Sequence, residues 1–331
     1  MRGPDELRSF RRHAEWALVV ATALELGLIE TLAERGGSPR EVADRLSLDP
    51  RGTEVLLRSL EPLAIVRRDG QRFRLTGSGR AFLIDRDSPD YQADSLLHWL
   101  AGLRRWAAEL PAAVRGSRTR GEEDPESSGT SGQRVAAFMA AMNNKPPGLV
   151  QAVCDAVCTS APSARSLLDL GGGPGTFARA FAGRGLAVTL LDRPEVVEHV
   201  RRSYGLEFHP GIELIQGDFL SEIPSRQWDV ILLANITHIY DEATNARLIE
   251  RAAARLAAGG TLAILDFVRG RADFAALFAV TMLLNTESGG TYDLPCYRTW
   301  LAGAGLRYLG CLRVSPEADL VLGRRQVAEE A

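Results

Sequence analysis

The sequence contains almost no lysine: of its 39 basic residues only Lys145 is lysine, and the others are arginine. The charges of the two signs nearly balance, because the 39 basic and 42 acidic residues leave a formal net charge of −3. A chain so close to neutral gives no overall electrostatic reason to expect a nucleic-acid or membrane partner. Cysteine is also scarce, and none of the four cysteines has a histidine at the spacings that zinc sites use. We therefore expect no metal site, and cysteines that act as small buried side chains in a reducing compartment.

Long hydrophobic runs are missing near the N-terminus. The longest run there, from Trp16 to Leu24, has nine residues, whereas a membrane-spanning helix needs about 20. Arg8, Arg11 and Arg12 precede it, but no small-residue cleavage site of a signal peptide follows. These features predict a cytoplasmic protein.

The composition is that of a globular protein, with 45% apolar and 24% charged residues. A length of 331 residues is enough for two domains. We divide the chain into an N-terminal domain (1–88), a helical linker and substrate-lid region (89–160) and a third part (161–331). The lid itself would be the segment 116–133, which is polar and rich in glycine, serine and glutamate.

The N-terminal domain has the pattern of a winged helix, in which helices are followed by a β-hairpin. Apolar residues at helical spacing predict a helix over 10–33. Residues 38–41 (Ser-Pro-Arg-Glu) form a capping box that starts a second helix, and Asp49-Pro50 starts a third. Asp69-Gly70 lies between two short β-rich runs and predicts the turn of a hairpin.

Winged helices often bind DNA, a function that needs basic side chains to neutralise phosphates. Residues 1–80 contain 14 basic and 12 acidic residues, so their net charge is only +2. We therefore predict dimerisation for this domain, and a DNA-binding regulator is the least favoured alternative.

The third part alternates strands and helices, which predicts a parallel sheet covered by helices on both faces. Five β-rich runs come first. Two more, over 306–314 and 319–323, are joined by so short a turn that they must be antiparallel. The predicted fold class is therefore α/β, with an antiparallel last strand in the sheet and a mainly helical N-terminal domain.

A glycine-rich loop, with Gly171, Gly173 and Gly175, follows the first of these strands. Glycines let the backbone turn sharply and let a ligand approach closely. The carboxyl end of the first strand in such a sheet is where nucleotide-like ligands bind. The dinucleotide fingerprint G-x-G-x-x-G is incomplete, because Thr176 stands where the third glycine belongs.

Acidic residues end the next two strands. Asp192 is placed to accept hydrogen bonds from both hydroxyls of a ribose. Asp218 is placed to accept one from the amino group of an adenine, and Phe219 could lie against the face of that base. An aspartate at such a position can also cap a turn or a helix. The glycine loop and both acids in this order favour a nucleoside-containing cofactor.

The motifs LLDLGGGPGTFARAF, LLDRPEVVEHV, GDFL and AAGGTLAILDF resemble those of the small-molecule O-methyltransferases that depend on S-adenosyl-L-methionine and carry an N-terminal winged-helix dimerisation domain. The resemblance covers nearly the whole chain and is strongest over 167–266. It implies a Rossmann-like, seven-stranded methyltransferase sheet, S-adenosyl-L-methionine bound by the motif glycines and the two acids, and a homodimer. It also implies a small aromatic substrate and a place in secondary metabolism such as antibiotic biosynthesis.

The candidate base is His238, which follows the fourth strand and would lie beside the cofactor. The resemblance implies that His238 is catalytic and that Asp266, at the end of the fifth strand, orients it. Asp266 is one methylene shorter than the glutamate usual in the family. A second family carboxylate is matched here by Tyr292, so this part of the catalytic apparatus differs.

The resemblance also implies an apolar substrate pocket, because soft thioethers and aromatic rings suit a flat ring substrate. The matching side chains, which could instead fill the core, are Trp99, Phe138, Met139, Met142, Phe278 and Met282.

A histidine base limits the acceptor to an acidic hydroxyl. Complete proton transfer from a phenol (pKa ~10) to an imidazole (pKa ~6.5) is uphill by ~5 kcal/mol. An alcohol with a pKa near the ~15.7 of water would cost ~12 kcal/mol. We therefore predict methylation of a phenolic or similarly acidic hydroxyl. Two alternatives stay open: methylation of carbon in an enolisable or tetrapyrrole substrate, and an enzyme that retains the cofactor without methylating.

Overall fold

The structure is a computed structural model that describes residues 3–116 and 131–326, without the side chains of 131–134. The chain forms two compact units, 1–104 and 105–331. The boundary between them lies within helix α6 (Ala93–Val114). Residues 117–130, most of the segment predicted as a lid, lie outside the described residues, and Ser131 already begins helix α7.

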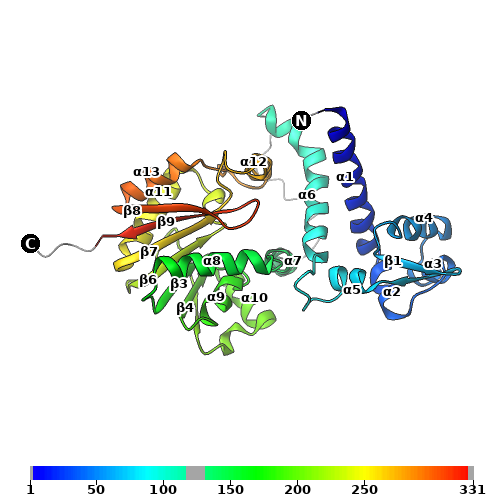
Figure 1. Cartoon of the computed structure of the whole chain (residues 1–331), viewed down its shortest axis with the longest axis horizontal. Coiled ribbons are helices and arrows are strands. Elements are labelled where there is room, and N and C mark those ends of the chain that lie inside the picture. Colours follow the sequence, from blue (N-terminus) through cyan, green and yellow to red (C-terminus); the bar gives the residue numbers. More distant parts are fainter. Residues whose placement is uncertain (1–2, 117–130, 327–331) are drawn as a thin grey trace, which may run out of the picture. The chain divides into compact units, whose positions relative to one another are not determined.

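The N-terminal unit is helical and contains one β-hairpin (Figure 1). Besides the first part of α6, its elements are α1 (Pro4–Glu25), α2 (Leu28–Arg35), α3 (Pro39–Leu46), α4 (Pro50–Leu60), β1 (Val66–Asp69), β2 (Arg72–Leu75) and α5 (Gly77–Leu83). The single helix predicted over 10–33 is in fact two, because Gly27 adopts left-handed backbone with a φ of +75° and turns the chain between α1 and α2. The hairpin at Asp69-Gly70 is confirmed, with β1 and β2 antiparallel.

Capping side chains fix where the short helices start. Ser38 Oγ accepts a hydrogen bond from Glu41 N at 3.3 Å, and Glu41 Oε2 accepts one from Ser38 N at 2.8 Å, which confirms the capping box at α3. Asp49 caps α4 by accepting a hydrogen bond at Oδ2 from the backbone nitrogen of Gly52. These local bonds hold the helices around a core that includes Leu28, Leu57 and Phe73, all nearly inaccessible to solvent.

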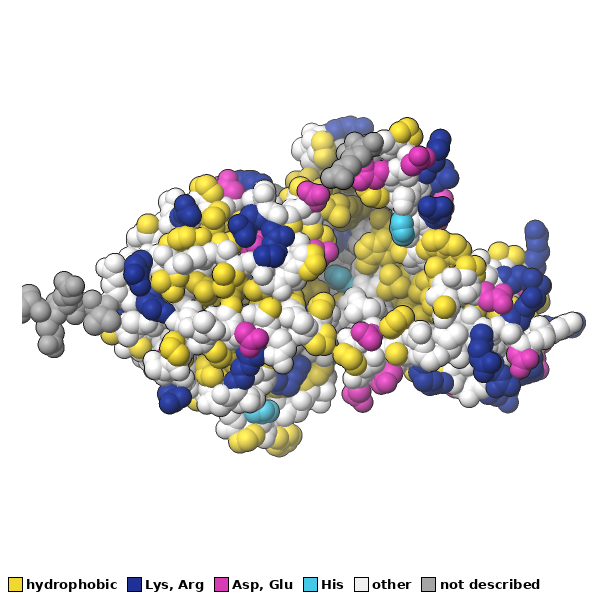
Figure 2. Space-filling model, viewed as in Figure 1, with side chains coloured by type: hydrophobic (Ala, Val, Ile, Leu, Met, Phe, Trp, Pro, Cys, Tyr) yellow, Lys and Arg dark blue, Asp and Glu magenta, His cyan; other side chains and the backbone are white. Residues whose placement is uncertain are grey.

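The surface of the N-terminal unit is partly apolar. Figure 2 shows hydrophobic side chains on this surface beside the arginine-rich beginning of α1. Leu7, Phe10 and Leu18 of α1 are 55%, 54% and 37% exposed. They are three and eight residues apart, so they lie along one face of the helix. No described helix is by itself long and apolar enough to cross a membrane, and only the bent pair α1 and α2 passes that test together, by length and composition alone.

The C-terminal unit is built on a seven-stranded sheet in the order β5-β4-β3-β6-β7-β9-β8 (Figure 1). Its strands are β3 (Ser166–Leu170), β4 (Ala187–Asp192), β5 (Ile212–Gln216), β6 (Trp228–Ala234), β7 (Leu256–Asp266), β8 (Leu306–Arg313) and β9 (Asp319–Arg325). The first five in this order are parallel, whereas β9 is antiparallel to both of its neighbours. The predicted fold class is thereby confirmed, including the antiparallel last strand.

Helices cover both faces of this sheet, and each face has its own core. The helices are α7 (Ser131–Asn143), α8 (Pro147–Ser160), α9 (Thr176–Ala182), α10 (Pro194–Tyr204), α11 (Glu242–Ala254), α12 (Asp273–Asn285) and α13 (Leu294–Gly303), with short 3-10 turns η1 (Leu206–Phe208) and η2 (Thr237–Ile239). Buried side chains of α8, α9 and α10 pack on one face, and those of α11 and α13 pack on the other. Apolar residues continue at helical spacing over 135–158, but the helix is interrupted at residues 144–146, because Pro146 and Pro147 cannot continue α7. This break places Lys145 in a loop.

Candidate active site

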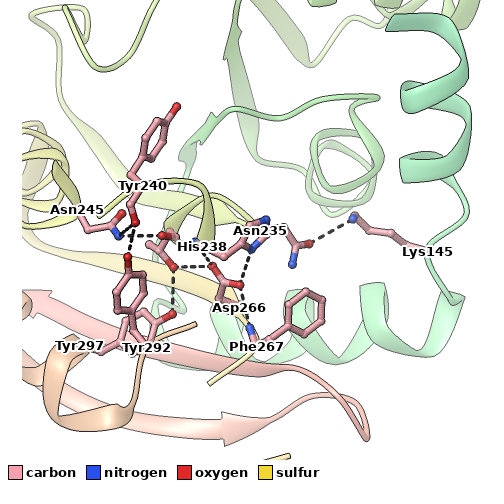
Figure 3. A network of polar contacts seen from close by, with 10 residues as sticks. Lys145, Asn235, His238, Tyr240, Asn245, Asp266, Phe267, Tyr292 and Tyr297 are labelled. Atoms are coloured by element: carbon pink, nitrogen blue, oxygen red, sulfur yellow. Dashed lines mark hydrogen bonds and ion pairs between the residues drawn. The ribbon is translucent and has the colours of Figure 1, made fainter. Parts of the chain in front are cut away.

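His238 and Asp266 face each other at the carboxyl ends of β6 and β7 (Figure 3). His238 Nδ1 lies 2.8 Å from Asp266 Oδ1, and both side chains are almost completely buried. Because β6 and β7 are adjacent parallel strands, two residues that follow or end them meet at one edge of the sheet. The structure therefore brings together the residues proposed as base and orienting carboxylate.

The carboxylate of Asp266 accepts hydrogen bonds from several groups. The backbone nitrogens of His238 and Phe267 donate at 3.1 and 2.9 Å, and the hydroxyl of Thr237 donates to Oδ2. Burial by itself raises the pKa of Asp266, but the His238 ring and these hydrogen bonds together bring that pKa below its ordinary value. Asp266 is therefore held as a carboxylate, the form that can stabilise a positive imidazolium.

Aromatic side chains surround the His238 ring. The ring of Phe278 in α12 lies 4.8 Å away, edge to face, and Phe267 lies nearly parallel at 6.1 Å. Phe274 contacts both phenylalanines. Sequence reasoning identified Phe278 but missed Phe267 and Phe274. Two aromatic rings thus lie close to the imidazole.

The turn that carries His238 is fixed by its neighbours. Asn245 of α11 donates from its side-chain amide to the carbonyl oxygens of Thr237 and Tyr240, at 2.8 and 3.1 Å. Tyr292 donates from its hydroxyl to the Tyr240 carbonyl. Burial, followed by the nearby charges of Glu242 and Asp241, raises the pKa of Tyr292 to about 12. Tyr292 therefore stays neutral and holds the turn, and it does not take the part of a second carboxylate.

The glycine loop combines close packing with open space. A Cβ at Gly171 would lie 2.4 Å from Ile236 Cδ1, and one at Gly175 would lie 2.2 Å from Leu206 Cδ2. A Cβ at Gly173 would meet only Met139 Sδ, at 3.9 Å. The backbone φ is positive at all three glycines. A side chain at Gly171 or Gly175 would thus be both strained and crowded, whereas Gly173 borders space that a ligand can occupy.

The two acids at the strand ends have different surroundings. Asp192 is 7% exposed and accepts hydrogen bonds from the backbone nitrogens of Gly173 and Arg193, at 2.9 and 2.8 Å. Asp218 is exposed and closes a turn with Leu220 and Ser221. Asp192 is thus hydrogen-bonded directly to the glycine loop. Asp218 instead stabilises a turn, and because it is exposed its carboxylate can accept further hydrogen bonds.

The predicted aromatic and thioether residues are distributed unevenly. Phe219 and Met282 are only 6% exposed, and Met139 is 4% exposed and belongs to the core that packs on α8 to α10. Phe138 of α7 is 46% exposed, and Met142 is half-buried. Trp99 lies in the N-terminal unit. Phe278, one of the predicted substrate side chains, contacts the His238 ring.

Sequence reasoning missed several groups around the site. Thr237 and Tyr297 extend the network of Asp266, with 3.0 Å between their hydroxyl oxygens. Asp169 lies in the glycine motif itself but was given no role. Lys145 was noted only as the single lysine, and its Nζ lies 3.3 Å from Asn235 Oδ1. The scarcity of lysine was the one signal that could have singled out Lys145.

Comparison with known protein families decides what this site belongs to. A family model described as an O-methyltransferase domain matches residues 110–307, more than half of the chain. The chain belongs to this family. A second model, described as an O-methyltransferase dimerisation domain, matches residues 17–85. The protein is thus an O-methyltransferase of the S-adenosylmethionine-dependent family with an N-terminal dimerisation domain.

Relatives of this O-methyltransferase match it over nearly their full length. The tetracenomycin polyketide synthesis 8-O-methyl transferase of Streptomyces glaucescens is 26% identical over 98% of both chains. The 3-hydroxy-5-methyl-1-naphthoate 3-O-methyltransferase of Streptomyces sahachiroi is 26% identical over 92% of this chain and 90% of its own. The solved structure of human N-acetylserotonin methyltransferase in complex with S-adenosylmethionine has the same fold, with a TM-score of 0.83, 24% identity and 99% coverage of both chains.

The residues of this O-methyltransferase fit the cofactor of its family. S-adenosylmethionine needs room at the loop after β3, acceptors for its ribose, and groups for its charged amino-acid end. The open face of Gly173, the carboxylate of Asp192 beside it and the buried carboxylate of Asp169, which has no hydrogen-bond partner among the described residues, meet these needs in turn.

Proposed function

We propose that this O-methyltransferase methylates a phenolic or similarly acidic hydroxyl of a small aromatic compound, with His238 as the general base. The proposal rests on the 2.8 Å contact between His238 Nδ1 and Asp266 Oδ1. An ionised carboxylate can only accept, so Nδ1 carries the hydrogen of this bond and Nε2 keeps its lone pair. Nε2 is then available to take the proton of an acceptor hydroxyl.

S-adenosylmethionine supplies a methyl group bonded to a positively charged sulfur. With the cofactor bound, His238 Nε2 would take the proton that the acceptor hydroxyl loses when its oxygen is methylated. Asp266 then stabilises the imidazolium, much as a buried aspartate does in other histidine-dependent enzymes. The rings of Phe267 and Phe278 keep water from His238, which strengthens the electrostatic support from Asp266.

Two observations support an aromatic acceptor. The surroundings of His238 are aromatic, which suits stacking or edge contacts with a flat ring. The names of the two Streptomyces relatives describe methylation of a polyketide and of a hydroxynaphthoate. We therefore place the substrate among aromatic natural products, with the cofactor contacts at Gly171, Gly173, Gly175, Asp192, Asp218 and Phe219, and the substrate contacts at Trp99, Phe138, Met139, Met142, Phe278 and Met282.

A labelled-methyl transfer assay tests this proposal. Carbon-13 S-adenosylmethionine is offered to a panel of phenols, enolisable keto acids and amines, and the chemical shift of the product methyl identifies the atom to which it is bonded. We expect label on phenolic oxygen, and a loss of ~10²–10⁴-fold in rate for His238→Ala, the contribution of a general base. The matched control is His199→Ala in α10, which should transfer label at the wild-type rate. Label on carbon or nitrogen, or an undiminished rate in His238→Ala, would contradict the proposal.

We also propose that the protein is a homodimer formed through its N-terminal unit. The dimerisation domain that matches residues 17–85 supports this assembly. The exposed apolar face of α1, with Leu7, Phe10 and Leu18, offers the kind of surface that association buries.

A further inference from the structure

Helix α12 begins without a capping side chain. Its N-cap position is Ala272, whose methyl group cannot accept a hydrogen bond from the first turn of the helix. By contrast, α3, α4, α5, α11 and α13 each begin with a capping serine, threonine or aspartate. Contacts from outside the helix therefore have to fix where α12 starts.

Arg271 supplies such contacts, two residues before α12 begins at Asp273. Its Nε donates to Asp319 Oδ1 at 2.9 Å. Its carbonyl oxygen accepts a hydrogen bond from the guanidinium of Arg313. Arg313 ends β8 and Asp319 begins β9, and the two residues pair across these antiparallel strands. Side chain and backbone of Arg271 thus attach the β7–α12 connection (267–272) to the end of the sheet.

Asp319 is the centre of this cluster. It is 0% exposed, and Arg313 Nε donates to the same Oδ1 at 3.0 Å, so two guanidinium groups share one oxygen. The other oxygen, Oδ2, is buried without a hydrogen-bond partner in the described parts of the chain. Burying charges is costly, and a buried ion pair often stabilises a fold no more than apolar side chains of similar volume would. The geometry that the cluster fixes therefore explains Asp319 better than a gain in the free energy of unfolding does.

The connection held by Asp319 leads directly to the aromatic rings beside His238. Phe267 begins the connection, and its ring lies 6.1 Å from the His238 ring. α12 follows with Phe278, whose ring lies 4.8 Å from that of His238 and 4.5 Å from that of Phe267. A displacement of the start of α12 would therefore move Phe278 relative to the proposed base. Misplacing reacting groups by ~1 Å can cost ~10²-fold in rate.

We infer that Asp319 is a positioning residue for methyl transfer. Through Arg271 it sets where α12 starts, and through α12 it sets the distance between Phe278 and His238. The acceptor ring lies against these aromatic side chains, so the inference rests on the proposed function. Asp319 acts on the alignment of the acceptor and not on the binding of the cofactor.

Arg271→Met tests the inference without leaving Asp319 unpaired, because Arg313 stays beside the carboxylate. We expect kcat/KM for the phenolic acceptor to fall by ~10-fold, within the range that a misplaced group produces. The fall should come mainly from a higher acceptor KM. Calorimetry should give the wild-type affinity for S-adenosylhomocysteine.

Three further variants distinguish positioning from a general loss of structure. Arg271→Lys keeps one donor for Asp319 and should restore part of the lost kcat/KM. Arg269→Met is the matched control, because Arg269 lies in the same connection but pairs with Asp293, at 3.5 Å, and should leave the acceptor KM unchanged. Asp319→Asn should behave like Arg271→Met if it folds, and Arg271→Met decides if it does not.

The ring protons of His238 give a second readout that needs no acceptor. Aromatic rings shift the magnetic resonance of nearby protons, so the His238 signal, identified by its loss in His238→Ala, should move in Arg271→Met and stay in place in Arg269→Met. An unmoved signal in Arg271→Met would overturn the inference, and so would a moved signal with an unchanged acceptor KM. If the wild type methylates no phenol, the proposed function fails, whereas the His238 signal still decides whether Asp319 positions α12.

Discussion

Asp266 holds His238 at two points, since Oδ1 lies 2.8 Å from the ring nitrogen Nδ1 and Oδ2 lies 3.1 Å from the backbone nitrogen. A single short carboxylate therefore fixes both the position and the tautomer of the proposed base. The aspartate can do this although it is one methylene shorter than a glutamate, because the η2 turn brings the His238 backbone directly over the end of β7.

Asp266→Asn should remove stability that depends on pH. The pKa of Asp266 lies below its ordinary value in the folded protein, so the ionised carboxylate stabilises the fold above pH ~4, and this stability is lost as the pH falls through the lowered pKa. We expect the variant to unfold at lower urea concentration than the wild type at pH 7, and the difference to shrink toward pH 3. A difference that stays constant over this range would show that Asp266 does not contribute through its charge.

Gly173→Ala should impair cofactor binding without a matching loss of stability. The φ of Gly173 is +52° and a Cβ there meets almost nothing. The substitution should therefore destabilise the fold only by the ~1–2 kcal/mol that an alanine in left-handed backbone costs. Gly70→Ala is the matched control, because Gly70 has a φ of +60° and open space but lies in the distant hairpin turn. We expect similar losses in melting temperature for both variants. Only Gly173→Ala should weaken the binding of S-adenosylhomocysteine, by ~10-fold or more. Unchanged affinity would mean that no ligand approaches Gly173.

Tyr297→Phe should slow methyl transfer although Tyr297 is a positioning residue and not a catalytic one. Its hydroxyl lies 3.0 Å from Thr237 Oγ1, which in turn donates to Asp266. Loss of the outer hydroxyl loosens Thr237 and with it the carboxylate, so we expect kcat to fall by ~3–10-fold, the effect of a hydrogen bond of ~1 kcal/mol, with KM for the cofactor unchanged. Thr237→Val should have a larger effect and Thr237→Ser should restore most of the rate. If Thr237→Ser behaved like Thr237→Val, the hydroxyl network would not explain the effect.

Binding of S-adenosylhomocysteine should release a proton near neutral pH. Burial, together with the charge of Asp192, raises the pKa of Asp169 to about 7, although Lys145 opposes this. Below that pH the free protein carries a protonated Asp169, and an ammonium group bound beside it favours the ionised form. Calorimetry at pH 6.5 in two buffers with different ionisation enthalpies should detect the released proton, and affinity should fall as the pH is lowered further. The signal should be absent at pH 9, in Asp169→Asn, and with 5′-methylthioadenosine.

A charge on the apolar face of α1 should dissociate the proposed dimer. Phe10 and Leu18 are 54% and 37% exposed, and burying each side chain in an interface contributes ~1.5–3 kcal/mol. We expect Phe10→Arg and Leu18→Arg to sediment as monomers at micromolar concentration. Leu312→Arg in β8 is the control, because Leu312 is 45% exposed but belongs to the other unit. A dimer that survives both α1 variants would place the interface elsewhere.

Sequence reasoning predicted the parts of the molecule that local patterns determine. The capping box at Ser38, the hairpin at Asp69-Gly70 and the strands around the glycine loop each depend on residues a few positions apart. The same patterns predicted at which edge of the sheet the site lies, because the carboxyl ends of parallel strands lie at one edge. His238 was placed at that edge from its position after a strand, whereas its pairing with Asp266 was expected only from the family resemblance.

The remaining contacts depend on side chains far apart in the sequence. Thr237 and Tyr297 are 60 positions apart, and no periodicity connects them. The turn at Gly27 and the break at residues 144–146 were hidden inside continuous helical spacing. Asp169 looked like one more residue of a buried strand, and what distinguishes it is that its carboxylate has no hydrogen-bond partner in the part of the chain that the structure describes.

The order of strands in the sheet has a consequence for how the protein is made. β9 lies between β7 and β8, although it follows both in sequence, and Asp266 at the end of β7 pairs with Asp319 at the start of β9. During synthesis on the ribosome, the outer edge of β7 therefore stays open until residues 319–325 have emerged. An open strand edge can pair with another chain, so nascent chains that stop short of β9 would expose the strand that ends in Asp266 and aggregate. Protection of this strand edge thus depends on a segment that contains neither the proposed base nor the glycine loop.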